Sequence, residues 1–341
     1  MQEKLQQQLL DRILDGFPRK PDAVDALRSL LNVSKDAIYR RLRGDSLLSP
    51  SEVALLARHF HISLDELVHE DSDRVYFSFS ALNNAANSVE DYLLGLHQNL
   101  HQLEHLPDVK VYYTTSEIPI FYYFLFEELA VFKLYIWGRS AWDFDYLKHQ
   151  PFDVRLISPH AVALSREILD LYFRLDTTEL WSINIFDNTL NQIEHHFLGG
   201  AIAAPEQALS LCDRLTDLAA HLQMMAAQGK KFKPRQSPDH GAPFALLHND
   251  SLYTNSTIFV DAPHLRRVFS TFGDPDYLVS SDGRICDFTD QWLQRLIGKS
   301  VPISAQSEGL RLGFFHQVRR KIEATKRRIL AEVDTPVISP P

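Results

Sequence analysis

The chain has 341 residues, which is enough for two or three domains and a large buried core. Hydrophobic residues make up 45% and charged residues 23%, a composition typical of a globular protein. The formal net charge of −9 excludes a protein that coats nucleic acid with a uniformly basic surface.

Three features indicate the compartment. Two cysteines in so long a chain argue against a disulfide framework and for a reducing environment. Residues 1–5 show no start of the apolar run of a secretory signal. Residues 118–137 are rich in Phe, Tyr and Leu, but Glu127, Glu128 and Lys133 interrupt them, so they are too charged for a membrane span. We therefore predict a cytoplasmic protein without a membrane segment.

The chain begins with a predicted amphipathic helix. Its apolar positions are Leu5, Leu9, Leu10, Ile13 and Leu14. A second helix is predicted over residues 22–31, with Asp22 as its N-cap. Asn32 tolerates a positive φ and favours a tight turn. Ser34 is suited to cap a third helix, which Gly44 ends.

Signals for two further helices follow. Ser49 fits the N-cap, Pro50 the first helical position and Glu52 the capping-box partner. Residues 62–67 are predicted to form a last short helix, capped by Ser63. The apolar residues of all these helices recur at helical spacing, so we expect the first part of the chain to be an all-α domain.

The helix between Ser34 and Gly44 has the most informative charge pattern. It carries four basic residues and one acid, whereas residues 1–70 together carry ten lysines and arginines against eleven acids. A basic helix after a tight turn is what a protein needs to place side chains in the DNA major groove. The alternative is a solvated charged face in a module that binds another protein.

This spacing resembles the Cro/C1-type (xenobiotic-response-element) helix-turn-helix family, over roughly residues 1–70. The matching residues are Leu27, Asn32, Val33, Ser34, Ile38, Gly44, Pro50, Ala57, Ile62, Ser63, Asp65, Glu66 and Leu67. Residues 37–44 also resemble long bacterial regulators with such an N-terminal domain. The resemblance implies a transcriptional regulator that binds double-stranded DNA.

The resemblance also implies which side chains contact DNA, because the early exposed residues of the second motif helix reach base edges in that family. The predicted base-reading residues are Lys35, Asp36, Tyr39 and Arg40. The predicted phosphate contacts are Ser34, Arg41 and Arg43. Lys35 or Arg40 would address guanine, and Asp36 would accept from cytosine N4.

Two positions depart from the family pattern. The family prefers a small residue four positions before the turn, where the helices cross, and this chain has Arg28. The family often begins the first motif helix with a glutamine that touches phosphate, whereas an acid, Asp22, stands here. The fold is expected all the same, but the phosphate contact from that helix is not. Because residues 1–70 are together near neutral, we expect binding of modest affinity that needs two copies of the module and depends only shallowly on salt.

Residues 71–107 are predicted to be a linker followed by a helix of the dimerisation type. Its apolar residues step by four and three, as in a short coiled coil. They are Leu82, Ala86, Val89, Leu93, Leu96, Leu100 and Leu103. Two interpretations stay open: the helix pairs two protomers, or it packs on its own domain. His97, His101 and His105 lie in the same helix, and we interpret them as solvated residues rather than metal ligands.

Residues 108–333 are predicted to form a mixed α/β body that senses an effector or dimerises. Strands are expected at residues 109–113, 131–137, 244–247, 257–260, 267–272 and 277–280. Helices are expected at residues 117–128, 159–174, 178–198, 205–228, 288–296 and 308–330. The first strand, helix and second strand predict a parallel pair. Residues 334–341 are predicted to be a disordered tail.

No catalytic motif is recognisable, and no cofactor or metal is predicted. The aromatic residues between 121 and 137 are interpreted as core, with an effector pocket as the alternative. The basic residues at 230–235 are interpreted as a solvated loop. Those at 319–328 are weak evidence for a second DNA contact, because bases late in a helix also favour its dipole.

The sequence thus predicts a multidomain protein: an all-α helix-turn-helix domain followed by a mixed α/β body. We expect a homodimeric, cytoplasmic, DNA-binding transcriptional regulator whose body accommodates a small-molecule effector. Two alternatives are an enzyme and an antitoxin-like protein that binds a partner. Each would use the N-terminal module only for localisation or dimerisation.

Overall fold

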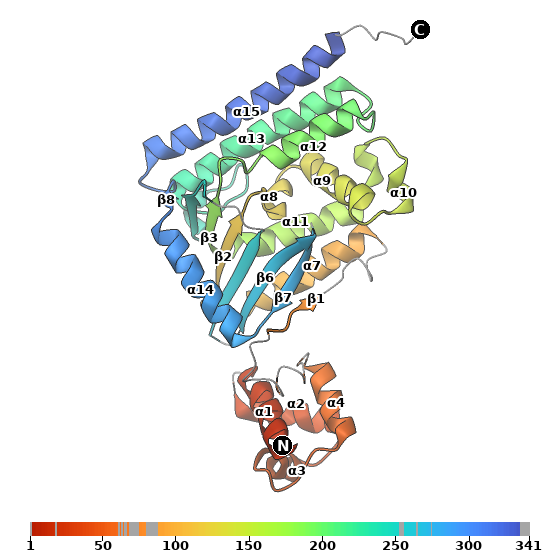
Figure 1. The fold of residues 1–341 in the computed structure, drawn as a ribbon, viewed down its shortest axis with the longest axis vertical. Helices are drawn as coiled ribbons and strands as arrows, with labels where there is room; N and C mark the ends of the chain where they lie inside the picture. Colours follow the sequence, from red (N-terminus) through yellow and green to blue (C-terminus); the bar gives the residue numbers. More distant parts are fainter. Residues whose placement is uncertain are drawn as a thin grey trace.

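Figure 1 shows the computed structural model, in which a small group of helices lies beneath a larger body of helices and strands. The structure describes residues 2–17, 19–60, 62, 64, 67, 75–79, 88–251, 256–263, 265–273 and 275–334. Half of the helix predicted at residues 62–67, including Ser63, lies outside the described residues. So do residues 80–87, with Leu82 and Ala86, and the tail beyond residue 334.

The N-terminal group is built from helices that share one cluster of buried apolar side chains. Its described helices are α1 (Gln2–Asp15), α2 (Lys20–Leu31), α3 (Lys35–Leu42) and α4 (Pro50–His59). Leu9, Val24, Leu27, Ile38 and Leu56 lie at the centre of the cluster, and none of them belongs to the apolar cluster of the body. The group therefore has a hydrophobic core of its own.

The ends of α3 and α4 follow the predicted signals. Asn32 takes a left-handed conformation with φ of 51°, and Gly44 has φ of 81°. The Ser34 side chain accepts from the Ala37 amide at 3.3 Å. At α4, Ser49 and Glu52 form the predicted capping box.

The start of α2 differs from the prediction. Arg19 rather than Asp22 occupies the N-cap, and the helix begins two residues before Asp22. The Arg19 side chain donates to the Asp22 carboxylate at 2.9 Å, which holds the acid in the first turn. Asp22 still lies where a negative charge favours the helix dipole.

The body is built on a mixed sheet whose described strands follow the order β1-β7-β6-β5-β2-β3-β4-β8. The strands are β1 (Ser78–Phe79), β2 (Lys110–Thr115), β3 (Asp176–Trp181), β4 (Phe244–His248), β5 (Thr257–Ala262), β6 (Leu265–Gly273), β7 (Asp276–Ser280) and β8 (Val301–Pro302). Strands β2, β3 and β4 are parallel, and every other pairing is antiparallel. The mixed α and β class is therefore as predicted.

The helices cover the two faces of the sheet unequally (Figure 1). They are α7 (Val89–Glu104), α8 (Ile120–Tyr123), α9 (Glu127–Ser140), α10 (Asp145–Lys148), α11 (Pro159–Phe173), α12 (Asp187–Leu198), α13 (Pro205–Gln228), α14 (Gly283–Gly298) and α15 (Glu308–Asp334). Helix α14 covers one face, where Cys286 and Leu293 pack on Phe259 and Val268. The main core lies on the other face, under α7, α8, α9, α11 and α13. No helix in the described part of the chain is both long and apolar enough to cross a bilayer.

The strand predicted at residues 131–137 is wrong, because these residues lie inside α9. Every residue from Leu129 to Gly138 is buried, so the helix has no polar face. A helix enclosed on all sides shows a continuous apolar run, which periodicity does not distinguish from a buried strand. The helix predicted at residues 117–128 is accordingly reduced to the short α8 and the start of α9.

The parallel partner of β2 is β3, which the sequence had suggested was the start of a helix. The predicted helix over residues 178–198 divides into β3 and α12. Along β3, Thr177, Glu179 and Trp181 are buried on the helix-rich side, whereas Leu180 is buried in a separate cluster with Leu296 and Ile297 of α14. Glu179 is fully buried. A charged residue at a core position hides the apolar–polar alternation by which a strand is recognised in a sequence.

Hydrogen bonds from aromatic residues surround the Glu179 carboxylate. It accepts from the Tyr122 hydroxyl, from the Tyr172 hydroxyl at 2.7 Å and from Trp181 Nε1 at 3.0 Å. Burial raises the pKa of Glu179, while the lysine Lys231 and these hydrogen bonds oppose that rise. The network explains how a carboxyl group is accommodated in the core.

Lys231 lies beside this network and is 1% exposed. Its Nζ donates to the Tyr172 carbonyl at 3.0 Å, and burial lowers its pKa to about 7. The neighbouring Lys233 pairs with Asp170. The interpretation of this basic segment as a solvated loop is therefore wrong at Lys231, because the side chain enters the core beneath α11.

Helix α7 packs on its own chain, against α11. Val89, Leu93, Leu100 and Leu103 of the predicted seam are buried in the main core, and Leu96 packs against it. The described part of the seam is therefore occupied within one chain. Of the two interpretations of this helix, packing on its own domain is the one the structure supports.

Replacing Leu93 by alanine tests this assignment. Leu93 is 0% exposed, so we expect Leu93→Ala to lower the free energy of unfolding of the body by about 2–5 kcal/mol. The neighbouring Leu94 is 41% exposed, and Leu94→Ala is expected to change it little. Urea denaturation followed by circular dichroism measures both. A Leu93→Ala protein that keeps its stability and instead dissociates into monomers would contradict the intrachain packing.

Candidate nucleic-acid interface

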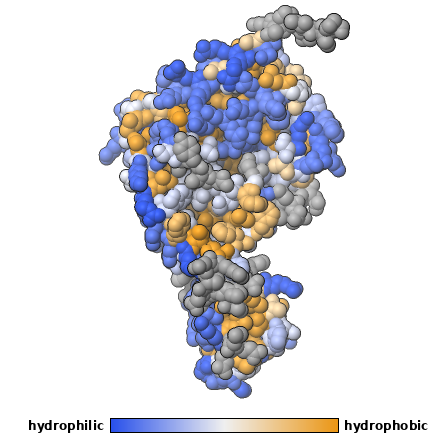
Figure 2. Space-filling view, in the orientation of Figure 1, coloured by the Kyte–Doolittle hydropathy of each residue, from blue (hydrophilic) through white to orange (hydrophobic). Residues whose placement is uncertain are grey.

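Helix α3 lies at the end of the N-terminal group that points away from the sheet (Figure 1). Ile38 anchors it in the small core, and Leu42 packs against that core. Hydrophilic residues cover the lower tip of the molecule, where this helix and the turn after it lie (Figure 2). The side of α3 that faces away from Ile38 and Leu42 is therefore open to solvent.

The structure leaves most of the predicted contact residues exposed. The exposed ones are Ser34, Lys35, Asp36, Arg40 and Arg43. Tyr39 is half-buried and packs on the small core, so its ring is fixed against its own group. Ser34 is occupied in capping α3, which leaves its backbone amide at the open end of the helix.

Acids of the same group partly neutralise two of the exposed bases. Lys35 Nζ lies 3.6 Å from the Asp25 carboxylate, and Arg43 Nε lies 2.8 Å from that of Asp45. Both pairs are well exposed, so each contributes little to stability. They do lower the positive potential that α3 presents to a polyanion.

Arg40 differs from these two bases. Its exposed guanidinium makes no hydrogen bond or ion pair with any residue that the structure describes. Asp36, also exposed, lies one helical turn before it on α3. Arg40 therefore presents a positive charge on this face that no described acid neutralises.

Arg41 does not belong to the exposed face, although it was predicted to contact phosphate. Its side chain is 14% exposed, and Nη2 donates to Glu52 Oε1 at 2.6 Å. Gln6 Nε2 donates to the Arg41 carbonyl at 3.0 Å. Arg41 therefore fastens α3 to α4 and α1, and the geometry does not favour the phosphate contact predicted for it.

Arg28 does not obstruct the crossing of α2 and α3. Its side chain is exposed and lies 3.9 Å from Asp25. The contact between the two helices is made instead by buried residues, including Leu27 and Ile38. A large residue is therefore tolerated at position 28, because its side chain lies outside the contact between α2 and α3.

Three bases of the basic run of α15 form ion pairs within the body. Lys321 Nζ lies 2.8 Å from Asp187, Lys326 Nζ lies 2.8 Å from Asp213, and Arg328 Nε lies 2.6 Å from Glu194. These acids belong to α12 and α13, so the pairs hold α15 on those helices. The run gives no support to a second DNA contact.

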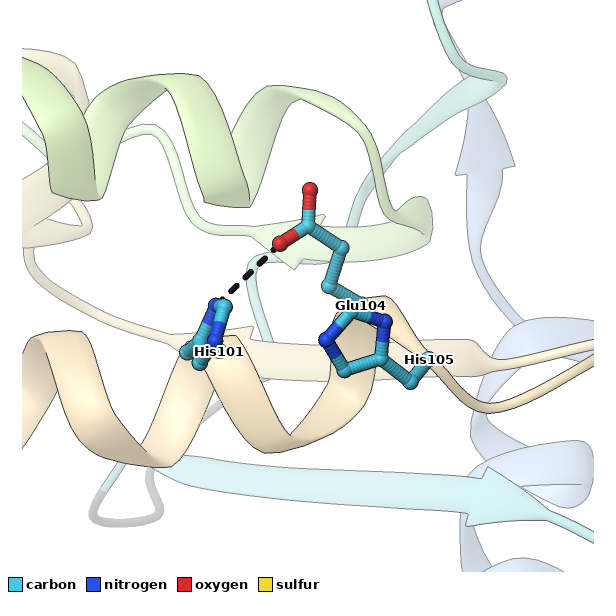
Figure 3. Close-up of side chains that lie close together, drawn as sticks. All are labelled: His101, Glu104 and His105. Carbon is cyan, nitrogen blue, oxygen red and sulfur yellow. Dashed lines mark ion pairs between the residues drawn. The ribbon is translucent and has the colours of Figure 1, made fainter.

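Of the histidines of α7, His101 and His105 are exposed, whereas His97 is half-buried with Nε2 3.5 Å from the Glu167 carboxylate. Figure 3 shows His101, Glu104 and His105 at the end of that helix, with one potential ligand atom of each within 4.8 Å of the others. His101 Nδ1 lies 3.2 Å from the Glu104 carboxylate, which also accepts from Arg174. All three are exposed, and Glu104 is already shared between two partners.

The sequence reasoning missed the acids that modulate the α3 face. Asp45 lies two residues from Arg43, so sequence proximity was a usable signal for that pair. Asp25 lies ten residues from Lys35, on another helix, and only the crossing of α2 and α3 brings the two together. Glu52 was predicted only as a capping residue, and its ion pair with Arg41 was not predicted.

No family model, curated protein or solved structure matches this chain.

Arg41→Met tests the structural role of Arg41, because it keeps the apolar stem and removes the bond to Glu52. The loss of a charged hydrogen bond costs roughly 1–3 kcal/mol, so we expect the amides of α3 and α4 to exchange about ten- to hundredfold faster. Hydrogen–deuterium exchange of the full chain measures this. Arg40→Met, one residue earlier and exposed, is the matched control and should leave exchange unchanged. Equal protection in both variants would contradict the fastening role.

Proposed function

We propose that this chain is a sequence-specific DNA-binding transcriptional regulator. Helices α2 and α3 with the turn between them form a helix-turn-helix, and α3 is the helix that enters the major groove. The observation that carries the proposal is the solvent-exposed face of α3, on which the Arg40 guanidinium pairs with no residue in the described part of the chain. Lys35, Asp36 and Arg40 read bases, while Ser34 and Arg43 contact phosphate.

The protein acts as a homodimer in the cytoplasm of a bacterial cell. A single α3 offers only three exposed bases, Lys35, Arg40 and Arg43, and two of them already have acidic neighbours. One copy therefore gains little from phosphate contacts, and two copies on a two-fold site are needed for a stable complex.

The N-terminal group and the body act as separate domains. Two separate clusters of buried apolar residues support this division. Ten basic and eleven acidic residues lie in residues 1–70, so most of the net charge of −9 belongs to the body. An acidic body is repelled by the DNA backbone, which leaves contact to the α3 face.

Loss of either exposed base should weaken specific binding. We expect Lys35→Ala and Arg40→Ala each to cost about 1–3 kcal/mol of binding free energy, because each removes a contact to a base edge. Selection from a pool of randomised duplexes first identifies the preferred site. Fluorescence anisotropy at fixed salt then measures the affinity of each variant for it.

Arg295→Ala is the matched control for these two variants. Arg295 is exposed on α14 of the body, so its loss changes the net charge equally without touching α3. If Lys35→Ala and Arg40→Ala both bind the selected site as tightly as the Arg295→Ala protein, α3 is not the reading helix.

The salt dependence of binding is a second test. With three exposed bases on the α3 face of each copy, the slope of log K against log salt should be no steeper than about −3 per copy. Anisotropy titrations between low and high salt give the slope. Asp45→Asn frees Arg43 from its ion pair and should steepen it. A wild-type slope steeper than about −5 per copy would mean that phosphate contacts lie elsewhere.

A further inference from the structure

A cavity of about 120 Å³ lies between α7 and the sheet. Leu100 and Leu103 of α7 form one wall, and α8 and α11 contribute Phe121 and Tyr172. Strands β2, β5, β6 and β7 form the floor. A dry apolar cavity on the order of 150 Å³ holds a benzene ring, so this space suits a ligand of that size.

The register of the sheet places one charged residue, Arg267, on the core-facing side of the cavity floor. Val111 of β2 pairs with Val260 of β5, which pairs with Arg267 of β6. The next row on the same face is Tyr113, Ile258 and Phe269, again apolar or aromatic. Arg267 therefore occupies a core-facing position in an otherwise apolar surface.

The Arg267 guanidinium has no partner among the residues that the structure describes. No acid lines the cavity, and Arg267 is its sole charged lining residue within the described chain. The side chain is half-buried, and desolvation lowers its pKa. A desolvated cation without a counter-ion is costly, and a bound anion removes that cost.

The adjacent Arg266 shows what the chain does with an arginine that has a structural role. It points to the opposite face of β6, where it lies 3.3 Å from Asp261 and 2.5 Å from Asp287 of α14. Two neighbouring arginines thus face opposite sides of one strand, one held by two acids and one directed into an apolar cavity. The contrast argues that Arg267 is reserved for a ligand.

We infer that this cavity binds a small monocarboxylic acid with a compact apolar body, of about the size of benzoate. The guanidinium of Arg267 holds the carboxylate in a bidentate pair, and the apolar walls enclose the rest of the molecule. A phosphate dianion fits less well, because Asn99 is the one other polar side chain besides the tyrosines among the described lining residues. Binding is independent of DNA, whereas an effector role for the ligand rests on the proposed function.

Benzoate is the probe for the test, with benzyl alcohol as its neutral counterpart. Titration calorimetry with the full chain, without DNA, should show saturable binding of benzoate, at least about tenfold tighter than of benzyl alcohol. Arg267→Met should weaken benzoate binding by about ten- to hundredfold, because it removes the charge and keeps the stem. Arg266→Met, on the opposite face of the same strand, should bind benzoate like the wild type.

The stability of the variants gives an independent readout. Arg267→Met removes an unpaired desolvated charge, so it should unfold at a urea concentration equal to or above that of the wild type. Benzoate should raise the unfolding midpoint of the wild type and of Arg266→Met, and leave that of Arg267→Met unchanged.

Three outcomes would overturn the inference: no saturable binding of benzoate, equal binding of benzyl alcohol, or full benzoate affinity in Arg267→Met. None of these measurements uses DNA. Failure of this inference is therefore distinguishable from failure of the proposed DNA binding.

Discussion

The cost of removing a charge from water governs this structure. Glu179 lies in the middle of the main core, and the chain surrounds it with hydroxyl and indole donors from α8, α11 and β3. These residues come from distant parts of the sequence, so their convergence fixes the helices on the sheet. A carboxylate left without them would cost several kcal/mol. The helix-rich face of the body is thus organised around one buried acid.

The same rule identifies the residues that are not explained by folding. Arg41 and Arg266 have acidic partners at short range, as do Lys321 and Arg328 on the last helix. Among the described residues, Arg40 and Arg267 have none. Arg40 is exposed, so water satisfies it, as it does other exposed arginines such as Arg295; its place on α3 is what fits the proposed contact with DNA. Arg267 is half-buried in an apolar surface, so its availability points to a small anion that enters the cavity.

Local signals made the N-terminal helices predictable from the sequence. The positive φ of Asn32, the cap at Ser34 and the capping box of Ser49 and Glu52 each involve residues within three or four positions of one another. Fold class and the later strands also followed from alternation and turn signals. Helix α9 did not, because its buried residues show no periodicity. Strand β3 was missed because a charged residue occupies its core face.

The site was predictable only in part, for a related reason. Charge and spacing identified the face of α3, but whether each arginine faces solvent depends on its tertiary neighbours. Arg41 is turned toward Glu52, eleven residues away, and no periodicity within α3 reveals that. No binding role was predicted for Arg267, since an arginine in a strand is usually on the solvent side. Only the register of β6 against β5 shows that it faces the core.

The cavity and the N-terminal helices meet at one strand. Arg267 precedes Val268, which pairs with Ser280 of β7, and the next residue, Ser281, accepts from Arg12 of α1 at 3.1 Å. The cavity and α1 are therefore connected through the pairing of β6 with β7 and the residue that follows β7. Proximity alone is not coupling, because a ligand shifts a conformational equilibrium only by binding its two states differently. The end of β7 is where such a difference would act, since it contacts both the cavity wall and the helix that supports α3 through Gln6. Two positions of this strand end would give the proposed acid a means of regulating the proposed DNA binding.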